Sequence, residues 1–408
     1  MITHRRPPIW QGCTPLADYD VSEALDTDYY SVFESIPDQD RAAWSRARVF
    51  VDESLPQMND FWERAEFPAH MIKRMGELNL LSDGLAVEGL EQLSPLAAGL
   101  VNMEVSRGDG SLGTVIAVQG GLALRSIALF GSPEQHQQWL GPVARGEKLA
   151  AFALTEPMHG SDSVALETTA RQEGDGFVLN GEKKWIGNGC GGDVSVVWAR
   201  DDSGNVRGFL VEQDRLGYEA QVVTGKASLR AINQARIRLE NVRIPATNVL
   251  PGTKSFKDAS RVLVATRLGV AWSALGHATA VYEAALNYVS QRTQFGKRLA
   301  KFQMVQDRLA YMLSELTSMQ LHCVHLAALD DAGQMRPTQA SMAKYHNTRK
   351  ARDLASIARD MLGGNGILLE NHVIRHLLDI ESLHTYEGTQ SIQALLIGRD
   401  VTGQSAFA

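Results

Sequence analysis

The sequence predicts an α+β protein in which an N-terminal helical domain and a C-terminal four-helix bundle flank a central antiparallel β domain. Three observations predict this class. A helical pattern extends from about residue 29 to 146, short β-rich segments lie between 152 and 251, and the helical period returns from 258. The expected divisions are an N-terminal arm over 1–27, a helical domain over 28–150, a β domain over 151–257 and a bundle over 258–408.

The N-terminal domain is expected to combine amphipathic and fully buried helices. Residues 41–64 are charged and amphipathic, residues 94–106 continue the helical pattern, and residues 112–129 are almost entirely apolar. Gly131 and Pro133 then interrupt the pattern, and Ser132 between them is placed to cap the next helix. The first 27 residues have three prolines and no apolar period, so we expect them to form an arm.

The β domain is predicted by short runs such as FVLNG, VSVVWAR and GFLVEQ, separated by turn signals. Residues 234–240 alternate with a period of two, as in a strand with one buried face. In the last domain, a 3-4 spacing of apolar residues indicates a helix–helix seam. The seam consists of Leu309, Met312, Leu316, Met319, Cys323 and Leu326.

Composition narrows the function. The 408 residues carry 40 basic and 47 acidic side chains, a formal charge of −7, which disfavours a protein that binds nucleic acid through phosphates. The cysteines, Cys13, Cys190 and Cys323, are too far apart for a disulfide framework and fit a reducing compartment. No secretory signal and no stretch of about 20 apolar residues is evident. We therefore expect a cytoplasmic protein without membrane insertion.

Several familiar site motifs are not matched. The GGNG of residues 363–366 is not a dinucleotide-binding fingerprint, and no phosphate-binding GxxxxGK[ST] sequence occurs. The pairs His372/His376 and His322/His325 lack acidic or thiolate partners at ligand spacing, so no metal site is expected.

Three other segments carry candidate chemistry. Residues 151–162, AFALTEPMHGSD, offer backbone N–H groups and hydroxyls that suit a heteroaromatic edge or a phosphate. The same residues are equally compatible with a simple connection from the helical domain to the β domain. Residues 181–189, GEKKWIGNG, place Trp185 beside glycines, as for a flat cofactor or for an ordinary hairpin core. Glu387, in HTYEGTQ, lies between an aromatic residue and a glycine where a helix begins. There it is either a desolvated base or a glutamate favoured by the helix dipole.

Taken in order, five motifs resemble the acyl-CoA dehydrogenase family. They are ALTEPxxGSD, GxKxWIxN, RxQFGxxLxxxQ, GGNG before a final helix, and YEGT. The similarity covers nearly the whole chain from about residue 29, and it is strongest to the branch of glutaryl-CoA dehydrogenases and the plant short-chain acyl-CoA oxidase. The resemblance implies FAD bound without a Rossmann fold, in a site shared between subunits of a homo-oligomer, usually a tetramer.

The resemblance assigns residues to FAD and to the substrate. Thr155 would hydrogen-bond the flavin ring, and Arg292 would hold the pyrophosphate of FAD bound to a neighbouring subunit. The residues implied for FAD are Phe152, Leu154, Thr155, Gly160, Ser161, Trp185, Ile186, Gly187, Arg292, Gln294, Phe295, Gln303, Asp360, Met361, Leu362, Gly363, Gly364, Thr389 and Phe407. Those implied for the acyl-CoA are Gly113, Thr114, Ser161, Arg267, Tyr386 and Gly388.

The implied reaction is α,β-dehydrogenation of an acyl-CoA thioester. Glu387 would remove the α-proton while the β-hydrogen leaves as hydride to flavin N5. The Glu387 backbone N–H and a ribityl hydroxyl of FAD would stabilise the charge on the thioester oxygen. An electron-transfer flavoprotein or O2 would then accept the electrons.

Two departures from the family pattern bear on the substrate and the acceptor. Gly113 and Thr114 stand where glutaryl-CoA dehydrogenases have the arginine and serine that grip a distal carboxylate, which predicts a short- to medium-chain acyl-CoA instead of glutaryl-CoA. Arg125 lies about 18 Å further along the predicted helix, too far to replace that arginine.

Gly187 stands where most dehydrogenases have Thr or Ser, as it does in the plant oxidase, so an acyl-CoA oxidase stays an alternative. Glutaryl-CoA dehydrogenation is a second alternative. A non-catalytic flavoprotein scaffold is a remote one, because Glu387, Thr155, Trp185 and Arg292 are all present.

Overall fold

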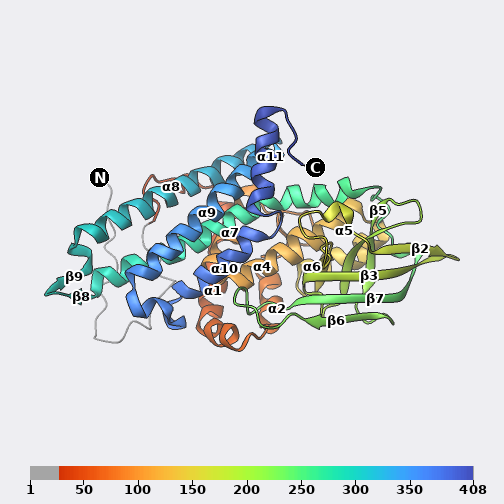
Figure 1. Cartoon of the computed structure of the whole chain (residues 1–408), viewed down its shortest axis with the longest axis horizontal. Helices are drawn as coiled ribbons and strands as arrows, with labels where there is room; N and C mark the ends of the chain where they lie inside the picture. The colour runs from red at the N-terminus through yellow and green to blue at the C-terminus, as the bar shows by residue number, and fades with distance from the viewer. Residues whose placement is uncertain (1–26, 408) are drawn as a thin grey trace.

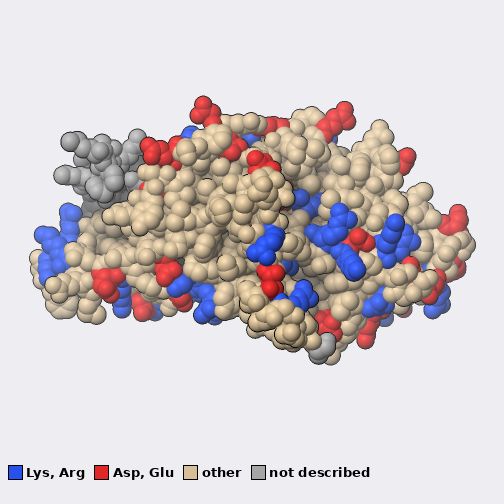
Figure 2. Space-filling view, turned by 90° about the horizontal axis from the view of Figure 1, so that it is seen from above, with Lys and Arg blue, Asp and Glu red and all other residues tan. Residues whose placement is uncertain are grey.

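The computed structural model describes residues 27–407, and its elements follow the predicted order of helices, strands and helices. The helices form an elongated body, the strands of the large sheet lie together at one end of it, and a small two-stranded hairpin lies at the other (Figure 1). The predicted arm, 1–27, lies outside the described residues except for residue 27. On the face drawn in Figure 2, acidic side chains lie among the basic ones.

The N-terminal domain contains the helices expected from its apolar pattern. They are α1 (Asp38–Arg64), α2 (His70–Glu77), α3 (Pro95–Gly108), α4 (Gly110–Ile116), the π-helix η1 (Ala117–Leu124), α5 (Arg125–Phe130) and α6 (Pro133–Ala144). Ser132 caps α6 as predicted, because its Oγ accepts from the Gln135 N–H while the Gln135 side chain accepts from the Ser132 N–H.

The apolar stretch 112–129 is divided among α4, η1 and α5, which follow one another without a break. Among the described residues, the run Gly110–Phe130 is long and apolar enough to cross a membrane by length and composition, but 67% of its apolar window is buried inside the protein. An apolar helix that is mostly buried is typical of a protein core. The π-helical part of this run, η1, contacts β1.

The β domain is a seven-stranded sheet in the order β1-β4-β2-β3-β7-β6, with β5 on β4. Its strands are β1 (Ala150–Ala153), β2 (Thr169–Glu173), β3 (Gly176–Gly187), β4 (Val194–Arg200), β5 (Val206–Glu212), β6 (Tyr218–Val222) and β7 (Gln234–Pro245). The alternation predicted for residues 234–240 is the buried–exposed pattern of β7. Most pairings are antiparallel as expected, but β1 and β2 each pair with β4 in parallel, so the sheet is mixed.

The C-terminal domain is a bundle of α7 (Phe256–Gln291), α8 (Gln303–Asp331), α9 (Pro337–Met361) and α10 (Val373–Thr385), and a further helix, α11 (Gln390–Thr402), lies against α9. The apolar seam predicted on α8 faces the core. A methyl group on Gly276 would lie 2.1 Å from the Met103 carbonyl oxygen, so glycine is what lets α7 approach α3.

Short elements complete the architecture. A two-stranded hairpin, β8 (Thr293–Gln294) with β9 (Lys297–Arg298), projects between α7 and α8. Single 3-10 turns lie at η2 (Ser163–Ala165), η3 (Ala246–Asn248), η4 (Leu299–Lys301), η5 (Gly363–Ile367) and η6 (Leu369–Asn371).

Candidate functional site

Glu387 lies in the short turn that connects α10 to α11, so a helix begins just after it as the sequence predicted. Its φ is +51° and that of Gly388 is +85°, both in the left-handed region. A glutamate adopts this conformation only at a cost, and such strain is retained where the surrounding contacts impose it. Thr389 then caps α11 by accepting a hydrogen bond from the Ile392 N–H.

The Glu387 carboxylate is surrounded by protein, although the residue as a whole keeps part of its surface accessible. Its Oε2 accepts a hydrogen bond of 2.9 Å from the Thr266 hydroxyl. Burial raises the pKa of Glu387, while Lys344, the Thr266 hydroxyl and Arg267 act to lower it. The site therefore holds a desolvated carboxylate, on a residue that keeps part of its surface exposed, whose pKa lies above its ordinary value, as a general base requires.

Lys344 on α9 and Arg267 on α7 are the basic groups beside this carboxylate. Lys344 is 1% exposed, and its Nζ donates to the carbonyl oxygens of Tyr386 and Gly388. Arg267 is also buried, and its Nη1 donates to the Ser341 hydroxyl at 3.0 Å. Burial lowers the pKa of Lys344 to about 7.

Sequence reasoning missed both Lys344 and Thr266. The available signal for Lys344 is a lysine on the same helical face as Ala340 and Ala343, both of which are buried.

The substrate-side residues Gly113 and Thr114 lie on α4. Thr114 is buried and donates to the Gly110 carbonyl at 2.8 Å. Burial raises the pKa of the Tyr386 phenol, and the nearby Thr114 hydroxyl acts to lower it. A side chain on Gly113 would start 2.2 Å from the Ser106 hydroxyl in α3. The chain thus brings Thr114, Tyr386, Gly388, Arg267 and Glu387 together, while any larger residue at 113 requires Ser106 to move.

Arg125, the first residue of α5, is held by Asp83. Its Nη2 donates to the Asp83 carboxylate at 2.8 Å and to the Asp83 carbonyl at 2.7 Å. Asp83 is near enough to the active carboxylate to raise the pKa of Glu387. Gly121 of η1 lies between Asp83 and Thr266, since a methyl group on it would lie 3.2 Å from the Thr266 side chain and 3.3 Å from the Asp83 carboxylate. Arg125 is therefore paired with a carboxylate that itself acts on the pKa of Glu387.

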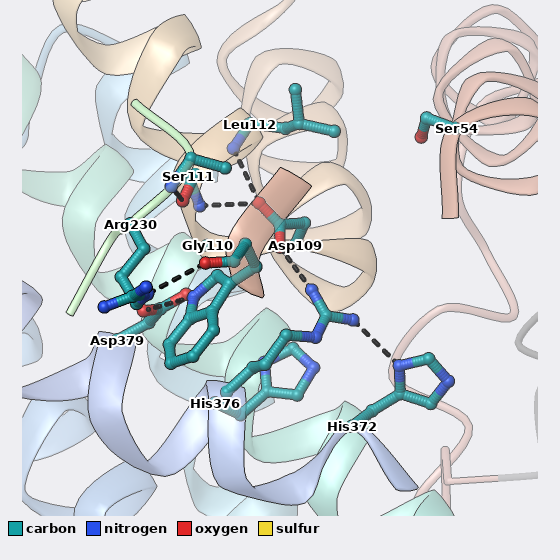
Figure 3. A network of polar contacts seen from close by, with 12 residues as sticks. Ser54, Asp109, Gly110, Ser111, Leu112, Arg230, His372, His376 and Asp379 are labelled. Carbon is teal, nitrogen blue, oxygen red and sulfur yellow. Dashed lines mark hydrogen bonds and ion pairs between the residues drawn. The ribbon is translucent and has the colours of Figure 1, made fainter. Parts of the chain in front are cut away.

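A buried polar network fixes α4 relative to α10 (Figure 3). Asp109 caps α4 by accepting from the Ser111 and Leu112 N–H groups, and it pairs with Arg375 of α10. Asp379, one turn further along α10, accepts from Trp62 Nε1 at 3.2 Å and from the Leu229 N–H at 2.6 Å. Because α4 carries Thr114 and α10 leads into Glu387, the network sets the position of one relative to the other.

A second group of predicted residues lies at the junction of β1 and β3. Thr155 accepts from the Lys184 N–H at 2.9 Å, and the turn after it is fixed by a buried Glu156–Lys183 ion pair of 2.8 Å. Trp185, with φ +66°, leaves 51% of its surface exposed. Phe152, Leu154 and Ile186 are buried in this region, and Gly160 and Ser161 are exposed.

Gly187 ends β3 against the π-helix η1. A methyl group on it would lie 2.8 Å from Cγ2 of Val118. The glycine that departs from the family pattern is therefore matched to Val118, and a threonine or serine there requires that valine to move.

A third group lies at the opposite end of the molecule, on and near the β8–β9 hairpin (Figure 1). Arg292 and Gln294 are exposed, and Phe295 is 92% exposed. Asp360, Met361 and Leu362 end α9, and the following Asn365 donates to the Tyr288 phenol at 3.1 Å. Gln303, at the start of α8, is exposed as well. This group does not meet Thr155 and Trp185 within one copy of the chain.

The residues present fit FAD when two copies are considered. Thr155 and the half-exposed Trp185 offer a polar edge and an aromatic face to a planar ring. At the other end, Arg292 is available to a pyrophosphate, and the positions next to the Cα atoms of Gly363 and Gly364 are open, with no heavy atom within 4 Å. Phe407, near the C-terminus, is partly exposed and lies under the Arg399 guanidinium at 5.9 Å.

Comparisons with known proteins agree with this geometry. Family models match in three consecutive parts: the acyl-CoA dehydrogenase N-terminal domain over residues 37–147, the middle domain over 151–242 and the C-terminal domain over 256–402. The short-chain specific acyl-CoA dehydrogenase of mitochondria from Homo sapiens is 36% identical over 381 residues, which cover 91% of this chain and 92% of that protein.

Solved structures give the same result. Glutaryl-CoA dehydrogenase from Mycobacterium smegmatis matches with a TM-score of 0.90 and 39% identity, over 92% of this chain and 97% of that chain. A glutaryl-CoA dehydrogenase from the same organism in complex with FADH2 matches with a TM-score of 0.91 and 37% identity, over 93% and 98% of the two chains. These matches confirm the resemblance carried by the five motifs. The chain belongs to the acyl-CoA dehydrogenase family, oxidoreductases that act on a CH–CH bond of an acyl-CoA with FAD as cofactor.

Proposed function

We propose that this chain catalyses the α,β-dehydrogenation of a short- to medium-chain acyl-CoA to the trans-2-enoyl-CoA, with Glu387 as the base. The observation that carries the proposal is the Glu387 carboxylate, whose pKa is raised by burial and which accepts a hydrogen bond from Thr266. A carboxylate in this state is suited to remove a weakly acidic α-proton near neutral pH.

The residues of the chain divide the work. Glu387 accepts the α-proton, and its backbone N–H is proposed to donate to the thioester oxygen as negative charge develops there. When bound, FAD supplies at N5 the acceptor for the hydride that leaves the β-carbon. Thr155 and Trp185 orient the flavin ring, and Tyr386 with Thr114 lines the acyl site.

The region around Gly113 and Arg125 supports an unsubstituted acyl tail. No side chain extends from Gly113, and the guanidinium of Arg125 is already paired with Asp83. A distal carboxylate bound here would lack a free cation at these positions, and burying an unpaired carboxylate costs several kcal/mol. Short acyl chains are therefore the better fit, in agreement with the human short-chain relative.

The wider assignments follow from the family and from the separated cofactor residues. We propose a homo-oligomer, most simply a tetramer, because Thr155 follows β1 of the large sheet while Arg292 precedes the β8–β9 hairpin, and this sheet and the hairpin lie at opposite ends of the chain (Figure 1). An electron-transfer flavoprotein is the proposed acceptor, and O2 is the alternative because of Gly187. We propose a cytoplasmic location and the domain divisions predicted from the sequence.

The test compares butyryl-CoA with glutaryl-CoA. We expect kcat/KM for butyryl-CoA to be higher by about two orders of magnitude, which corresponds to about 3 kcal/mol for an unpaired buried carboxylate. Anaerobic bleaching of the flavin by each thioester, followed by readmission of O2, separates substrate choice from oxidase activity.

Glutaryl-CoA dehydrogenation is the second candidate, favoured by the similarity to the Mycobacterium smegmatis enzyme. A preference for glutaryl-CoA with release of CO2 would establish it and overturn the short-chain assignment.

A further inference from the structure

We propose that Lys344 is a positioning residue for the base: its ammonium group holds the turn that carries Glu387 and keeps the Glu387 carboxylate ionised. The inference rests on the proposed function, because it assigns Lys344 a role in proton abstraction by Glu387. Lys344 is buried and takes no direct part in the proposed reaction.

The position of Lys344 needs an explanation. Its side chain is 1% exposed, on the face of α9 that packs under the turn between α10 and α11. Its Nζ donates to the Tyr386 carbonyl and, at 2.5 Å, to the Gly388 carbonyl, the residues on either side of the base. A buried ammonium is costly unless it has both hydrogen-bond acceptors and a negative partner. Carbonyl groups supply the first, and Glu387 is the negative partner beside it.

The hydrogen bonds fix the backbone of the turn. Gln393, fully buried on α11, donates from Nε2 to the carbonyls of Glu387 and Gly388, each at 3.0 Å. Together with Lys344, it gives all three consecutive carbonyls of residues 386–388 a side-chain donor. These contacts hold Glu387 at its positive φ, and this backbone conformation sets the direction of its side chain.

The charges around Glu387 come from three directions. Lys344 on α9 and Arg267 on α7 favour its ionised form, while Asp83, which is paired with Arg125, opposes it. On the side of α10, the Tyr386 phenol is next to the carboxylate, and burial raises its pKa, so it supplies no countercharge. The pKa of His384, which lies near Lys344, is lowered by burial and neighbouring arginines. The Thr266 hydroxyl, which donates a hydrogen bond to the Glu387 carboxylate, is neutral. Removing Lys344 thus removes one of two countercharges.

Loss of the Lys344 charge is expected to raise the pKa of Glu387. Without the Lys344 charge, burial of Glu387 is less well offset, so the pKa of Glu387 rises further. The base is then protonated up to a higher pH, and the acid limb of the pH profile moves in the alkaline direction. An opposite charge at this range changes a carboxyl pKa by about 1 to 3 units, so a shift of about that size is expected.

The experiment uses the FAD-loaded protein and follows anaerobic flavin bleaching by butyryl-CoA between pH 5 and 9. Three variants separate charge from hydrogen bonding: Lys344→Met removes both, Lys344→Gln removes the charge but keeps an N–H donor, and Lys344→Arg keeps both. Lys350→Met is the control, because Lys350 lies on the same helix but pairs with Glu315 of α8. We expect the acid limb to move by about 1 to 3 pH units in Lys344→Met and Lys344→Gln, and to stay in place in Lys344→Arg and in the control.

The outcomes are distinct. The maximal rate above the acid limb should fall more in Lys344→Met than in Lys344→Gln, because only the glutamine side chain can still donate a hydrogen bond to the turn. An unchanged acid limb in flavin-loaded Met or Gln protein would overturn the proposal and leave Lys344 a purely structural role. If Lys344→Met and Lys344→Gln do not retain flavin, a displaced acid limb in Lys344→Arg overturns the proposal instead. Failure of the parent protein to bleach with any acyl-CoA would refute the proposed function, a result separate from any of these.

Discussion

At the scale of single residues, the chemistry depends on Glu387 being both buried and ionised. Burial raises its pKa, and the groups beside it, Lys344, Thr266 and Arg267, lower it. A base works best when its pKa lies near the working pH, because it is then ionised and still binds the proton it removes. These opposing influences are the ones that the proposed role of Glu387 as a base requires.

The residue-scale prediction is that Glu387→Gln retains FAD and the fold but loses turnover. The amide has nearly the same shape and can still accept from Thr266, yet it cannot take the α-proton. Anaerobic flavin bleaching by butyryl-CoA should slow by ~10² to 10⁴-fold. Glu381→Gln, an exposed change on the preceding helix, serves as the control and should behave as the parent. Bleaching of the Glu387 variant near the parent rate would show that another group is the base.

At the scale of elements, the packing of α10 against α4 and α7 is fixed by polar groups and not only by apolar packing. His277 of α7 and His376 of α10 contact each other through their Nδ1 atoms at 2.8 Å, and His372 contacts Arg375 at 2.8 Å. Burial, with nearby Arg375, lowers the pKa of His277 and of His372 to about 3, and it places that of His376 well below its ordinary value. These histidines are neutral in the folded protein at neutral pH.

This interface makes the stability depend on pH. A histidine whose pKa is lowered by folding binds its proton only in the unfolded chain between about pH 6.5 and 3. The free energy of unfolding therefore falls as the pH drops through that range, by at most about 1.4 kcal/mol per pH unit for each histidine. Asp379, whose pKa burial raises to about 7, has the opposite effect. A comparison of variants is thus more informative than the slope of the parent alone.

The element-scale prediction is that His372→Asn weakens this pH dependence. Asparagine tolerates the φ of +59° found at His372 and keeps an oxygen that can accept from Arg375. Between pH 7 and 5, the apparent Tm of the variant should fall less steeply than that of the parent. His70→Asn, at an exposed position, should leave the slope unchanged. A slope equal to the parent's in His372→Asn would show that this histidine does not titrate on unfolding.

At the scale of the whole molecule, the two groups of proposed FAD residues lie at different ends of the chain (Figure 1). Thr155 and Trp185 lie in and next to the β domain, while Arg292 and the highly exposed Phe295 lie on the hairpin between α7 and α8. One FAD can use both groups only if a second copy supplies one of them. Cofactor binding and assembly should therefore be linked.

The molecule-scale prediction is that Arg292→Ala loses FAD and assembly together. A guanidinium makes fork-shaped, charge-assisted hydrogen bonds to a pyrophosphate that alanine cannot replace. Flavin absorbance and size-exclusion mass should both fall in this variant. Both should be retained in Arg243→Ala, which removes an exposed ion pair of the β domain. A fully flavinated oligomer of Arg292→Ala would separate the two properties and refute the shared site.

Much of the fold and of the candidate site was predictable from the sequence because those features are local. The helical period, the alternation in β7, the seam of α8 and the cap at Ser132 each depend on residues close together in the chain. The motif around Glu387 identified the candidate base for the same reason, since an aromatic residue, a glutamate and a glycine at a helix start are adjacent.

The tertiary structure alone decided what depends on residues far apart in the chain. The parallel pairing of β1 with β4 joins segments some forty residues apart, and no local pattern records it. Lys344 and Thr266 reach the turn that carries Glu387 from two other helices, and Asp83, paired with Arg125, acts to raise the pKa of Glu387. The pKa of a buried carboxylate is set by such through-space neighbours, because burial and nearby charge act over distance and not along the sequence. Sequence therefore pointed to the candidate base, and only the folded arrangement determined which groups act on its charge.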